Sequence, residues 1–558
     1  MMMTPYDDTL AVAGSGTTQT DSDWWRGAVI YHIYPRSYRD TTGDGIGDLP
    51  GVVEKLDYVA SLGVDALWLS PFFTSPMKDF GYDVSDYCDV DPMFGTLADF
   101  DRLVEGAHAR GLKVLIDLVL SHTSDQHPWF TESRQDRTNP KADWYVWADP
   151  KPDGTPPTNW PSIFGGSAWE WNSKRRQYYM HNFLASQPDL NFHCEAVRCE
   201  LLDTARFWLD RGVDGFRLDT VNMYTHDRVL RDNPPLAPHM VINGIPPENP
   251  YGMQEPLYNI NRPENLRFVE RLREVLDDYG ATTSVGEIGA VTDMYQSIAD
   301  YTTLGRLHMA YSFDFMTPEF SATHVRRVVE RMATRAGEGW PSWAFSNHDV
   351  PRVLSRWGLD AYPEAAPLLV AIASSLRGSA CLYQGEELGL PEAEVPFEKL
   401  QDPYGIRFWP EFKGRDGCRT PMPWDASEAV GFTSGEPWLP APEAHRARSV
   451  AEQEGDPSAP LNRVRRFLAW RKSVPALLLG EIAFQEAHEP ALVFTRSTSD
   501  QCVLCAMNLS QQPIRVDLPG LGRLRAIEAG GFEGGGRVDG GGIELGAWGA
   551  VFAAVEES

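Results

Sequence analysis

The sequence lacks the long apolar runs that a membrane-spanning protein needs. Although 42% of its 558 residues are hydrophobic, no stretch approaches the roughly 18 consecutive apolar residues that cross a bilayer. The first 20 residues contain no basic segment followed by an apolar one, so they do not resemble a signal peptide. We expect a flexible tail over residues 1–23, no membrane contact and a cytoplasmic location.

Positive charge is scarce. The chain has 50 Lys and Arg against 78 Asp and Glu, which gives a formal charge of −28. Such a surface repels phosphate backbones, so we do not expect a nucleic acid partner. The simplest interpretation of the charge is a soluble acidic surface.

Cysteine is also sparse, at 7 residues, and the odd number fits no framework of disulfides in a chain of this size. We expect reduced thiols. Cys502 and Cys505 form a CxxC motif, but it lies in a strand-like segment with no second pair nearby. A zinc or redox site is therefore not expected there.

The sequence does contain a repeated alternation of strand-like and helix-like segments. Amphipathic stretches such as 97–111, with apolar residues three to four positions apart, separate apolar and β-prone runs. These runs lie at 28–34, 65–70, 113–120, 212–219, 281–288, 309–315, 341–347 and 379–385. Eight such strands predict an α/β protein with a (β/α)8 TIM barrel over residues 24–122 and 191–475.

Two segments interrupt this alternation, and a third region follows it. Residues 123–190 are rich in Trp, Pro, Gly and Asn and predict an irregular lobe inserted after the third strand. The loop 232–256 contains seven prolines, so it cannot form one regular helix. We expect both to wall a pocket. Residues 476–558 change to short alternating strands and predict a C-terminal antiparallel, sandwich-like β domain.

Four of the apolar runs end in carboxylates or histidines. They are DLVLSH at 117–122, GFRLDT at 215–220, VGEI at 285–288 and FSNHD at 345–349. Acids at strand tips spread over more than two hundred residues converge at the C-terminal face of a barrel. This pattern predicts an active site.

The chemistry of two carboxyl groups fits the cleavage of a glycosidic bond, where one attacks the sugar and the other protonates the leaving oxygen. These four motifs, with FGYDVSDY and GRDGCRTPMPW in the same order, resemble the α-amylase clan, glycoside hydrolase family 13, in its α-glucosidase and oligo-1,6-glucosidase branch. The resemblance covers about 24–475. It implies that Asp219 is the nucleophile, Glu287 the general acid and base, and Asp349 a third acid that grips sugar hydroxyls.

The neighbourhood of the two main acids supports these roles. Arg217 precedes Asp219 by two residues, so on a strand both side chains share a face and the arginine would keep the aspartate ionised. Glu287 ends an apolar strand, and burial there would raise its pKa. Taken alone, each acid could equally form a structural ion pair or a cap.

The resemblance also implies a pocket for the terminal glucose. An aspartate–arginine pair, Asp83 with Arg419, would close it, so that the enzyme acts on chain ends. Phe164 and Phe183 belong to the aromatic inserted lobe, where phenylalanines often pack in the hydrophobic core, so a core position is the alternative for both. The implied binding residues are Tyr82, Asp83, His122, Phe164, Phe183, Gln187, Arg217, Thr220, His348 and Arg419.

One departure from the family bears on metals. Relatives usually carry Asn where this chain has Ser121, which puts the calcium site of amylases in doubt. A second loop, RDTTGDGIGD, has the early spacing of a calcium loop and predicts a structural Ca²⁺, although position twelve is Gly51 instead of a bidentate Glu. A hydrogen-bonded turn is the alternative. The expected ligands are Asp40, Thr42, Asp44, the Ile46 carbonyl and Asp48.

These features predict a retaining, exo-acting α-glucosidase for small α-glucosides, with glucosyl transfer as a side reaction and no organic cofactor. In the branch that the chain resembles, α-1,6-preferring enzymes tend to have Val directly after the nucleophile, so Thr220 at this position implies a preference for α-1,4 links, with sucrose as a second substrate. An oligo-1,6-glucosidase and a sucrose-specific hydrolase or transglucosylase stay open. A catalytically inactive binding homologue would have lost the acids, which this chain keeps. A monomer or a homodimer is expected.

Overall fold

An eight-stranded parallel sheet forms the centre of the computed structural model, which describes residues 21–242, 244–336, 339–539 and 542–556. Neighbouring strands follow the order β11-β10-β9-β5-β2-β1-β13-β12. A parallel bridge between Ala310 and Pro341 joins the two ends of the sheet. The strands are β1 (Val29–Ile33), β2 (Ala66–Leu69), β5 (Lys113–Leu118), β9 (Gly215–Leu218), β10 (Thr283–Glu287), β11 (Met309–Tyr311), β12 (Ser342–Ala344) and β13 (Ser379–Tyr383). The predicted (β/α)8 barrel is confirmed, and each predicted apolar run contains one of its strands.

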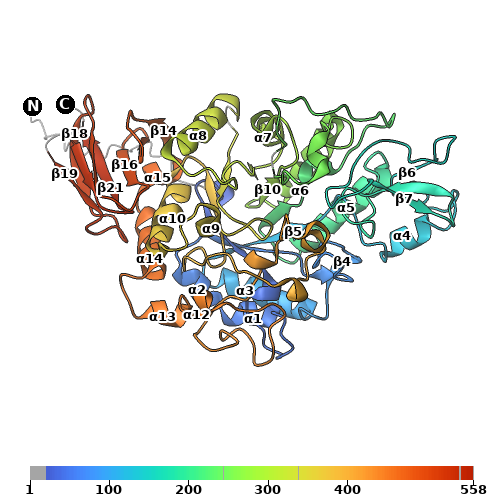
Figure 1. Ribbon diagram of the computed structural model, residues 1–558, viewed down its shortest axis with the longest axis horizontal. Coiled ribbons are helices and arrows are strands. Elements are labelled where there is room, and N and C mark those ends of the chain that lie inside the picture. The colour runs from blue at the N-terminus through green and yellow to red at the C-terminus, as the bar shows by residue number, and fades with distance from the viewer. Residues whose placement is uncertain (1–20, 243, 337–338, 540–541, 557–558) are drawn as a thin grey trace, which may run out of the picture.

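Helices cover the outside of the barrel (Figure 1). In α3, Thr96 accepts a hydrogen bond from the Asp99 backbone and Asp99 accepts one from Thr96, which forms a capping box. The predicted helix over 97–111 ends earlier, at His108, and the chain reverses at Gly111 with a φ of +73°. The helices between the strands are α1 (Leu49–Glu54), α2 (Leu56–Ser61), α3 (Leu97–His108), α5 (Glu195–Leu209), α6 (Leu266–Asp278), α7 (Met294–Thr302), α8 (Ala322–Ala336), α9 (Val353–Arg356) and α10 (Ala366–Ser375).

The inserted lobe over 123–190 is more regular than predicted. Strands β6, β8 and β7 form a three-stranded antiparallel sheet beside α4, at the opposite end of the molecule from the C-terminal domain (Figure 1). The segments WEWN and QYYM are rich in aromatic residues that favour strands, and Trp160, Trp169 and Met180 form a small core beneath them. The elements are α4 (Pro128–Ser133), β6 (Trp147–Ala148), β7 (Trp169–Asn172) and β8 (Gln177–Met180).

Long connections complete the catalytic face. The proline-rich loop 232–256 contains, among its described residues, one short 3-10 helix, η4 (Pro250–Met253). A two-stranded sheet of β3 (Phe73–Thr74) and β4 (Asp86–Val90) follows β2. After β13 the chain forms α11 (Pro403–Phe408), α12 (Glu443–Arg446), α13 (Val450–Glu454), α14 (Pro460–Arg471) and α15 (Pro475–Leu479).

The C-terminal region consists of two antiparallel sheets that share an apolar core. One has the order β14-β15-β16-β21-β18 and the other β17-β20-β19, and residues such as Val493, Leu504 and Ile543 fill the space between them. The strands are β14 (Glu481–Phe484), β15 (Ala491–Ser497), β16 (Cys502–Asn508), β17 (Ile514–Asp517), β18 (Arg523–Ile527), β19 (Gly536–Asp539), β20 (Gly542–Leu545) and β21 (Ala550–Glu556). The predicted C-terminal β domain is confirmed.

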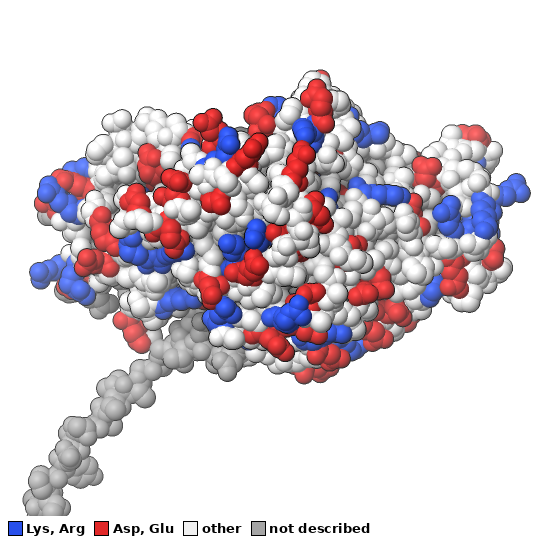
Figure 2. Space-filling model, turned by 90° about the horizontal axis from the view of Figure 1, so that it is seen from below, with Lys and Arg blue, Asp and Glu red and all other residues white. Residues whose placement is uncertain are grey.

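Two further observations concern the surface and the N-terminus. On the face in Figure 2, acidic and basic side chains are interspersed, so the excess of acid forms no single field there. None of the helices in the described ranges is long and apolar enough to cross a membrane. Of the predicted tail, only η1 (Asp21–Asp23) is described, and residues 1–20 lie outside the described residues.

Candidate active site

Acidic side chains from separate strands meet at the C-terminal end of the barrel. Asp117 lies in β5, Asp219 directly follows β9 and Glu287 ends β10. Asp349 follows β12 after a short connection. Parallel strands present their C-terminal ends on one face, so these residues, far apart in the sequence, become neighbours.

Arg217 connects three of these acids. Its Nη1 donates hydrogen bonds to Asp219 Oδ1 at 2.7 Å and to Asp117 Oδ1 at 2.8 Å. Its Nη2 lies 2.6 Å from Glu287 Oε2 and donates to the Tyr311 hydroxyl. The predicted contact between Arg217 and Asp219 is present, and the same guanidinium also contacts the second acid.

The same guanidinium lies close to both acids, at 2.7 Å from Asp219 and 2.6 Å from Glu287. Burial raises the pKa of Asp219 and of Glu287 to about 7, and Arg217 opposes the shift in both. The prediction that Arg217 keeps Asp219 ionised is therefore not met in full, because burial outweighs the arginine. Glu287 also accepts from the Tyr311 hydroxyl at 2.9 Å and the Thr220 backbone at 3.2 Å. Two such carboxyls can share one proton near neutrality, as a nucleophile and a proton donor require, and the division of the two roles rests on the family resemblance.

Thr220 has a left-handed backbone, with φ 39° and ψ 48°. This conformation is unusual for a β-branched residue. It directs the Thr220 N–H to Glu287, and the Thr220 hydroxyl donates to Ser121 Oγ at 3.3 Å. The residue after the nucleophile therefore contacts the general acid as well.

Asp349 lies among cations. Arg419 donates to its Oδ1 at 2.8 Å and Arg415 at 3.3 Å. Burial raises the pKa of Asp349, but the two arginines outweigh it and the net pKa is lowered. The His348 ring stacks on Tyr82, whose hydroxyl lies 2.6 Å from His348 Nε2 and donates to Asp117. Asp349 is thus held as a carboxylate that can accept sugar hydroxyls.

The predicted pairing of Asp83 with Arg419 is wrong. Asp83 accepts hydrogen bonds from Ser75 and from the backbone of Lys78, so it stabilises a turn. The aspartate–arginine pair at the cavity is Asp79 with Arg415, at 2.8 Å.

The misassignment has a simple cause. Each correct residue lies four positions before the predicted one, at 79 against 83 and at 415 against 419. GRDGCRTPMPW contains both arginines, and Asp79 lies directly before FGYDVSDY, which contains Asp83. The sequence alone does not tell which aspartate or which arginine faces the ligand.

A cavity of about 130 Å³, here called the catalytic cavity, lies above these acids. Eight of the predicted residues line it: Tyr82, His122, Phe164, Phe183, Asp219, Thr220, Glu287 and Asp349. Four other predicted residues contact lining residues, namely Arg217, His348, Gln187 and Arg419. Asp83 does not line the cavity. The structure adds lining residues that the sequence analysis missed, namely Asp79, Ile163, Met223, Gly244, Ile245, Gly289, Ala290, Phe313, Val350, Tyr404 and Arg415.

Several of the missed residues come from the irregular segments. Ile163 belongs to the lobe and Ile245 to the proline-rich loop, so both segments border the cavity as predicted. No periodic signal marks single side chains in such loops. Arg415 had the clearest sequence signal, because GRDGCRTPMPW contains two arginines.

Gln187 and Ser121 support two residues that line the cavity, Asp79 and His122. Gln187 donates to Asp79 Oδ2 at 2.9 Å, and Ser121 Oγ lies 2.8 Å from His122 Nδ1. Burial lowers the pKa of His122 to about 4, so the ring is neutral at pH 7. The His122 Nε2 contact with the Tyr82 carbonyl at 3.0 Å requires the proton on Nε2, which leaves Nδ1 to accept from Ser121.

The predicted calcium loop is hydrogen-bonded within itself. Asp40 accepts from the backbone of Thr42, Gly43 and Gly45, and Asp44 accepts from Ile46. Asp48 caps α1 by accepting from Gly51. Among the residues described, no group of three or more His, Cys, Asp or Glu side chains is arranged to hold a metal. These hydrogen bonds leave further lone pairs on the carboxylates, and the predicted ligand set also includes a hydroxyl and a carbonyl, so the structural Ca²⁺ stays a prediction.

A TIM-barrel pocket with two buried carboxyls on one arginine defines the class of protein, a glycoside hydrolase. The family model of the alpha-amylase catalytic domain matches residues 32–480, and the chain belongs to this family.

Similar proteins narrow the family to the predicted branch. The chain is 56% identical to the "Probable alpha-glucosidase" of Rhizobium meliloti (strain 1021), over 97% of this chain and 98% of that protein. It is 38% identical to the "Oligo-1,6-glucosidase" of Heyndrickxia coagulans, over 89% and 94%. The crystal structure of an alpha-glucosyl transfer enzyme, XgtA, superimposes with a TM-score of 0.93 at 58% identity, over 96% of this chain and 99% of that one. The predicted α-glucosidase branch is confirmed, and the protein is a glucosidase-type enzyme.

Proposed function

We propose that this enzyme is a retaining, exo-acting α-glucosidase that releases glucose from the non-reducing end of short α-glucosides. The observation that carries the proposal is the contact of Asp219 and Glu287 with neighbouring nitrogens of one guanidinium, Arg217, beneath a narrow cavity. Carboxyls held this way favour the short separation of about 5–5.5 Å of retaining enzymes over the 6.5–9.5 Å of inverting ones.

The reaction has two steps. In the first, an oxygen of Asp219 attacks the anomeric carbon, the bond from that carbon to the glycosidic oxygen breaks, and Glu287 gives its proton to the departing oxygen. In the second, Glu287 takes a proton from water while the water oxygen attacks the same carbon and Asp219 leaves. Two inversions return the α configuration.

Exo-action is supported by the pair Asp79 and Arg415. Both side chains are buried, and Arg415 also binds Asp402 at 2.7 Å and contacts Asp349. Phe164 stacks on Tyr404 beside them. A wall held by these charged and aromatic contacts would stop a sugar chain at its terminal unit.

For linkage we propose that α-1,4 links are preferred and that sucrose is a second substrate. The proposal rests on Thr220, whose hydroxyl is held by Ser121 beside the nucleophile. An α-1,6 preference is the alternative, since one similar protein is named oligo-1,6-glucosidase.

Glucosyl transfer to alcohols is the proposed side reaction, because an alcohol can replace water in the second step. Apolar side chains border the catalytic cavity, among them Met223, Ile245 and Phe313. Such walls hold an organic acceptor better than they hold water. The similar structure titled as an alpha-glucosyl transfer enzyme supports the same reaction.

The test combines product stereochemistry with a substrate panel. Maltose, isomaltose, sucrose and trehalose are each incubated with enzyme, and products are resolved by chromatography and by ¹H NMR within the first minutes. We expect α-glucose to be the first anomer released, and maltose to have the highest kcat/KM of the four disaccharides. Early β-glucose contradicts retention, and loss of amylose iodine colour ahead of glucose release contradicts exo-action. No turnover of any substrate would favour an inactive binding protein.

Three further points stay predictions from the sequence. They are the cytoplasmic location, the monomeric or homodimeric state, and a structural Ca²⁺ in the loop of Asp40 to Asp48. A hydrogen-bonded turn without metal is the alternative for this loop.

A further inference from the structure

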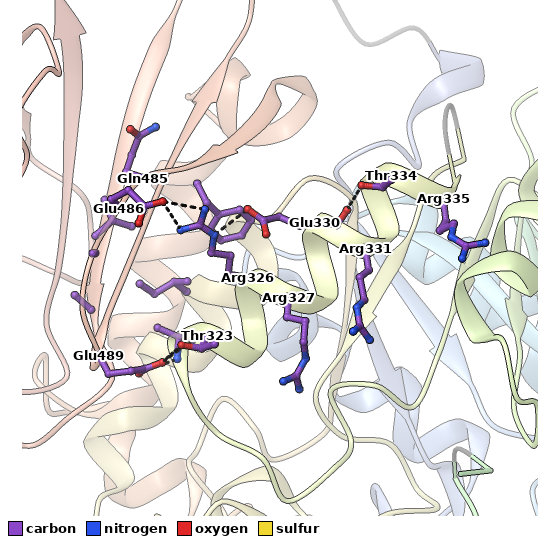
Figure 3. Close-up of a pocket in the computed structure, with 16 residues that line it drawn as sticks. Thr323, Arg326, Arg327, Glu330, Arg331, Thr334, Arg335, Gln485, Glu486 and Glu489 are labelled. Carbon is purple, nitrogen blue, oxygen red and sulfur yellow. Dashed lines mark hydrogen bonds and ion pairs between the residues drawn. The ribbon is translucent and has the colours of Figure 1, made fainter. Parts of the chain in front are cut away.

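Two cavities outside the active site are rich in arginine. The larger, about 720 Å³, lies between α8 and strands β14 and β15. Its arginines have nearby acids: Arg326 pairs with Glu330 and Glu486, as Figure 3 shows, and Arg327 pairs with Glu319. This α8 cavity therefore offers little uncompensated positive charge.

The smaller cavity, here called the α5–α6 cavity, lies where α5 and α6 begin and has about 260 Å³, twice the volume of the catalytic cavity. Four arginines line it against a single lining acid, Glu264. The four are Arg198, Arg228, Arg267 and Arg271. On a chain of formal charge −28, such a concentration of positive charge calls for a physical reason.

Ion pairing within the protein accounts for two of these arginines only. Arg198 and Arg271 both pair with Glu195, at the start of α5. Arg228 and Arg267 are exposed, and neither forms a hydrogen bond or an ion pair with any residue that the structure describes. After Glu195 and Glu264 are counted, two positive charges remain.

Arg267 lies near the start of α6, a helix of 13 residues whose own first turn has no acidic residue. A 3-10 turn, η5 (Pro263–Asn265), leads directly into α6 and carries Glu264. A cation near a helix start opposes the helix dipole, so helix stability alone gives no reason for an arginine here, and an anion beside it would be favoured.

A hydroxyl also lines the cavity. Thr225 is 3% exposed as a whole residue and borders the cavity. Within the described part of the chain its hydroxyl makes no hydrogen bond, so it can donate to a ligand oxygen in the cavity.

We propose that the α5–α6 cavity binds a phosphate dianion, either free phosphate or the phosphate of a small monoester, through Arg228, Arg267 and the Thr225 hydroxyl. Arginine presents paired donors that match phosphate oxygens. Thr225 lies two residues after Met223, which borders the catalytic cavity. One short segment therefore borders both cavities.

The test measures phosphate binding by calorimetry and by the melting temperature, with ionic strength held constant by chloride. We expect saturable binding of inorganic phosphate, with a melting temperature that rises as ligand linkage requires. In the double variant Arg228→Ala with Arg267→Ala, Kd should rise at least about tenfold. Thr225→Val should weaken binding by a smaller factor.

A matched control changes the same charge in the other cavity. Arg331→Ala with Arg335→Ala removes two exposed arginines from the α8 cavity and should leave phosphate binding unchanged. Equal loss in both double variants, or unchanged binding in Arg228→Ala with Arg267→Ala, overturns the proposal.

Sugar phosphates separate the two sources of the anion. If glucose 6-phosphate binds at least about tenfold more tightly than phosphate, and this gain is lost in Arg228→Ala with Arg267→Ala, the ligand is a monoester. Equal affinity assigns free phosphate. Glucose alone is the control for binding in the catalytic cavity, and a sugar phosphate signal that matches glucose in every variant counts against the site.

Discussion

Two clusters of arginine and acid border the same cavity, and they differ in the ratio of cations to carboxyls. The first, at the ends of β9 and β10, has one arginine, Arg217, among three carboxyls. The second has two, Arg415 and Arg419, among three carboxyls. The first set is Asp117, Asp219 and Glu287, and the second is Asp79, Asp349 and Asp402.

The difference appears in the protonation of the acids. In the first cluster burial dominates and raises the pKa of Glu287 and Asp219 to about 7. In the second, burial is outweighed by the arginines at Asp349 and Asp402, whose pKa values are lowered, while at Asp79 burial still raises the pKa. With one arginine among three acids, the first cluster keeps a proton available for catalysis. With two arginines, the second cluster keeps Asp349, which lines the cavity, as a carboxylate that can accept sugar hydroxyls.

The largest expected effect comes from the first cluster. Asp219→Asn removes the nucleophile and with it the covalent route, so kcat for maltose should fall by roughly four orders of magnitude or more. Circular dichroism should show an intact fold. Asp57→Asn, at an exposed surface pair with Arg110, is the control and should keep full activity. A loss below about tenfold would remove Asp219 from its role.

Removing a cation from the second cluster should lower activity less than the loss of the nucleophile does. Arg415→Leu leaves Asp79 and Asp402 without their ion-pair partner and weakens the grip on the terminal sugar. Loss of charge-assisted contacts of about 1.5–3 kcal/mol lowers kcat/KM for maltose by about 10- to 150-fold. Steady-state kinetics measures it. If Asp83→Asn, which alters the turn beside it, has a larger effect than Arg415→Leu, the assignment of the pair is wrong.

The pH profile follows from the first cluster. Activity requires ionised Asp219 and protonated Glu287, and the two titrate as a coupled pair near pH 7. Thus kcat/KM should fall about tenfold per unit on the acid side as Asp219 gains a proton, and on the alkaline side as Glu287 loses one.

Glu287→Gln separates the two limbs. With a nitrophenyl glucoside, whose leaving group needs little acid assistance, this variant should keep the acid limb and lose the alkaline one. An unchanged alkaline limb would assign it to another group. Asp349, with its lowered pKa, should add no limb near neutrality.

A smaller effect is expected at the junction of the two acids. Thr220→Val keeps the branched shape but removes the hydroxyl that contacts Ser121. The ratio of kcat/KM for maltose over isomaltose should fall by about 1 kcal/mol, or roughly fivefold. An unchanged ratio would show that the loops set linkage choice. Ser121→Ala is the matched variant, because it removes the other end of the same contact.

The smallest effect concerns the loop of Asp40 to Asp48, which belongs to neither cluster. If the loop is a metal-free turn whose carboxylates accept only backbone and side-chain hydrogen bonds, treatment with EDTA should leave the melting temperature within about 1 °C. A fall of several degrees, reversed by Ca²⁺, would support the calcium prediction instead. Asp40→Asn distinguishes the two, because in a metal-free turn it weakens the fold without any response to Ca²⁺.

The sequence predicts the barrel and its acids because both depend on local signals. Runs such as KVLIDLVL are rich in apolar residues and predict a buried strand without knowledge of the neighbouring elements. Asp219 and Glu287 lie at the ends of two other such runs. The aspartate–arginine pair at the catalytic cavity required a choice between Asp79 and Asp83, and only the fold of the turn decides which of the two faces the cavity. The apolar wall from Ile245 and Phe313 depends on loops whose course is set by tertiary contacts. The inserted sheet was missed because its strands are only two to four residues long.

The strained backbone of Thr220 has a consequence for evolution in the laboratory. A conformation of this kind costs about 1–3 kcal/mol, and asparagine adopts it more readily than a β-branched residue does. Selection for heat resistance alone should therefore enrich Thr220→Asn, at the position that contacts the general acid. Selection for thermal stability that does not also assay the products would therefore alter the linkage preference of the enzyme.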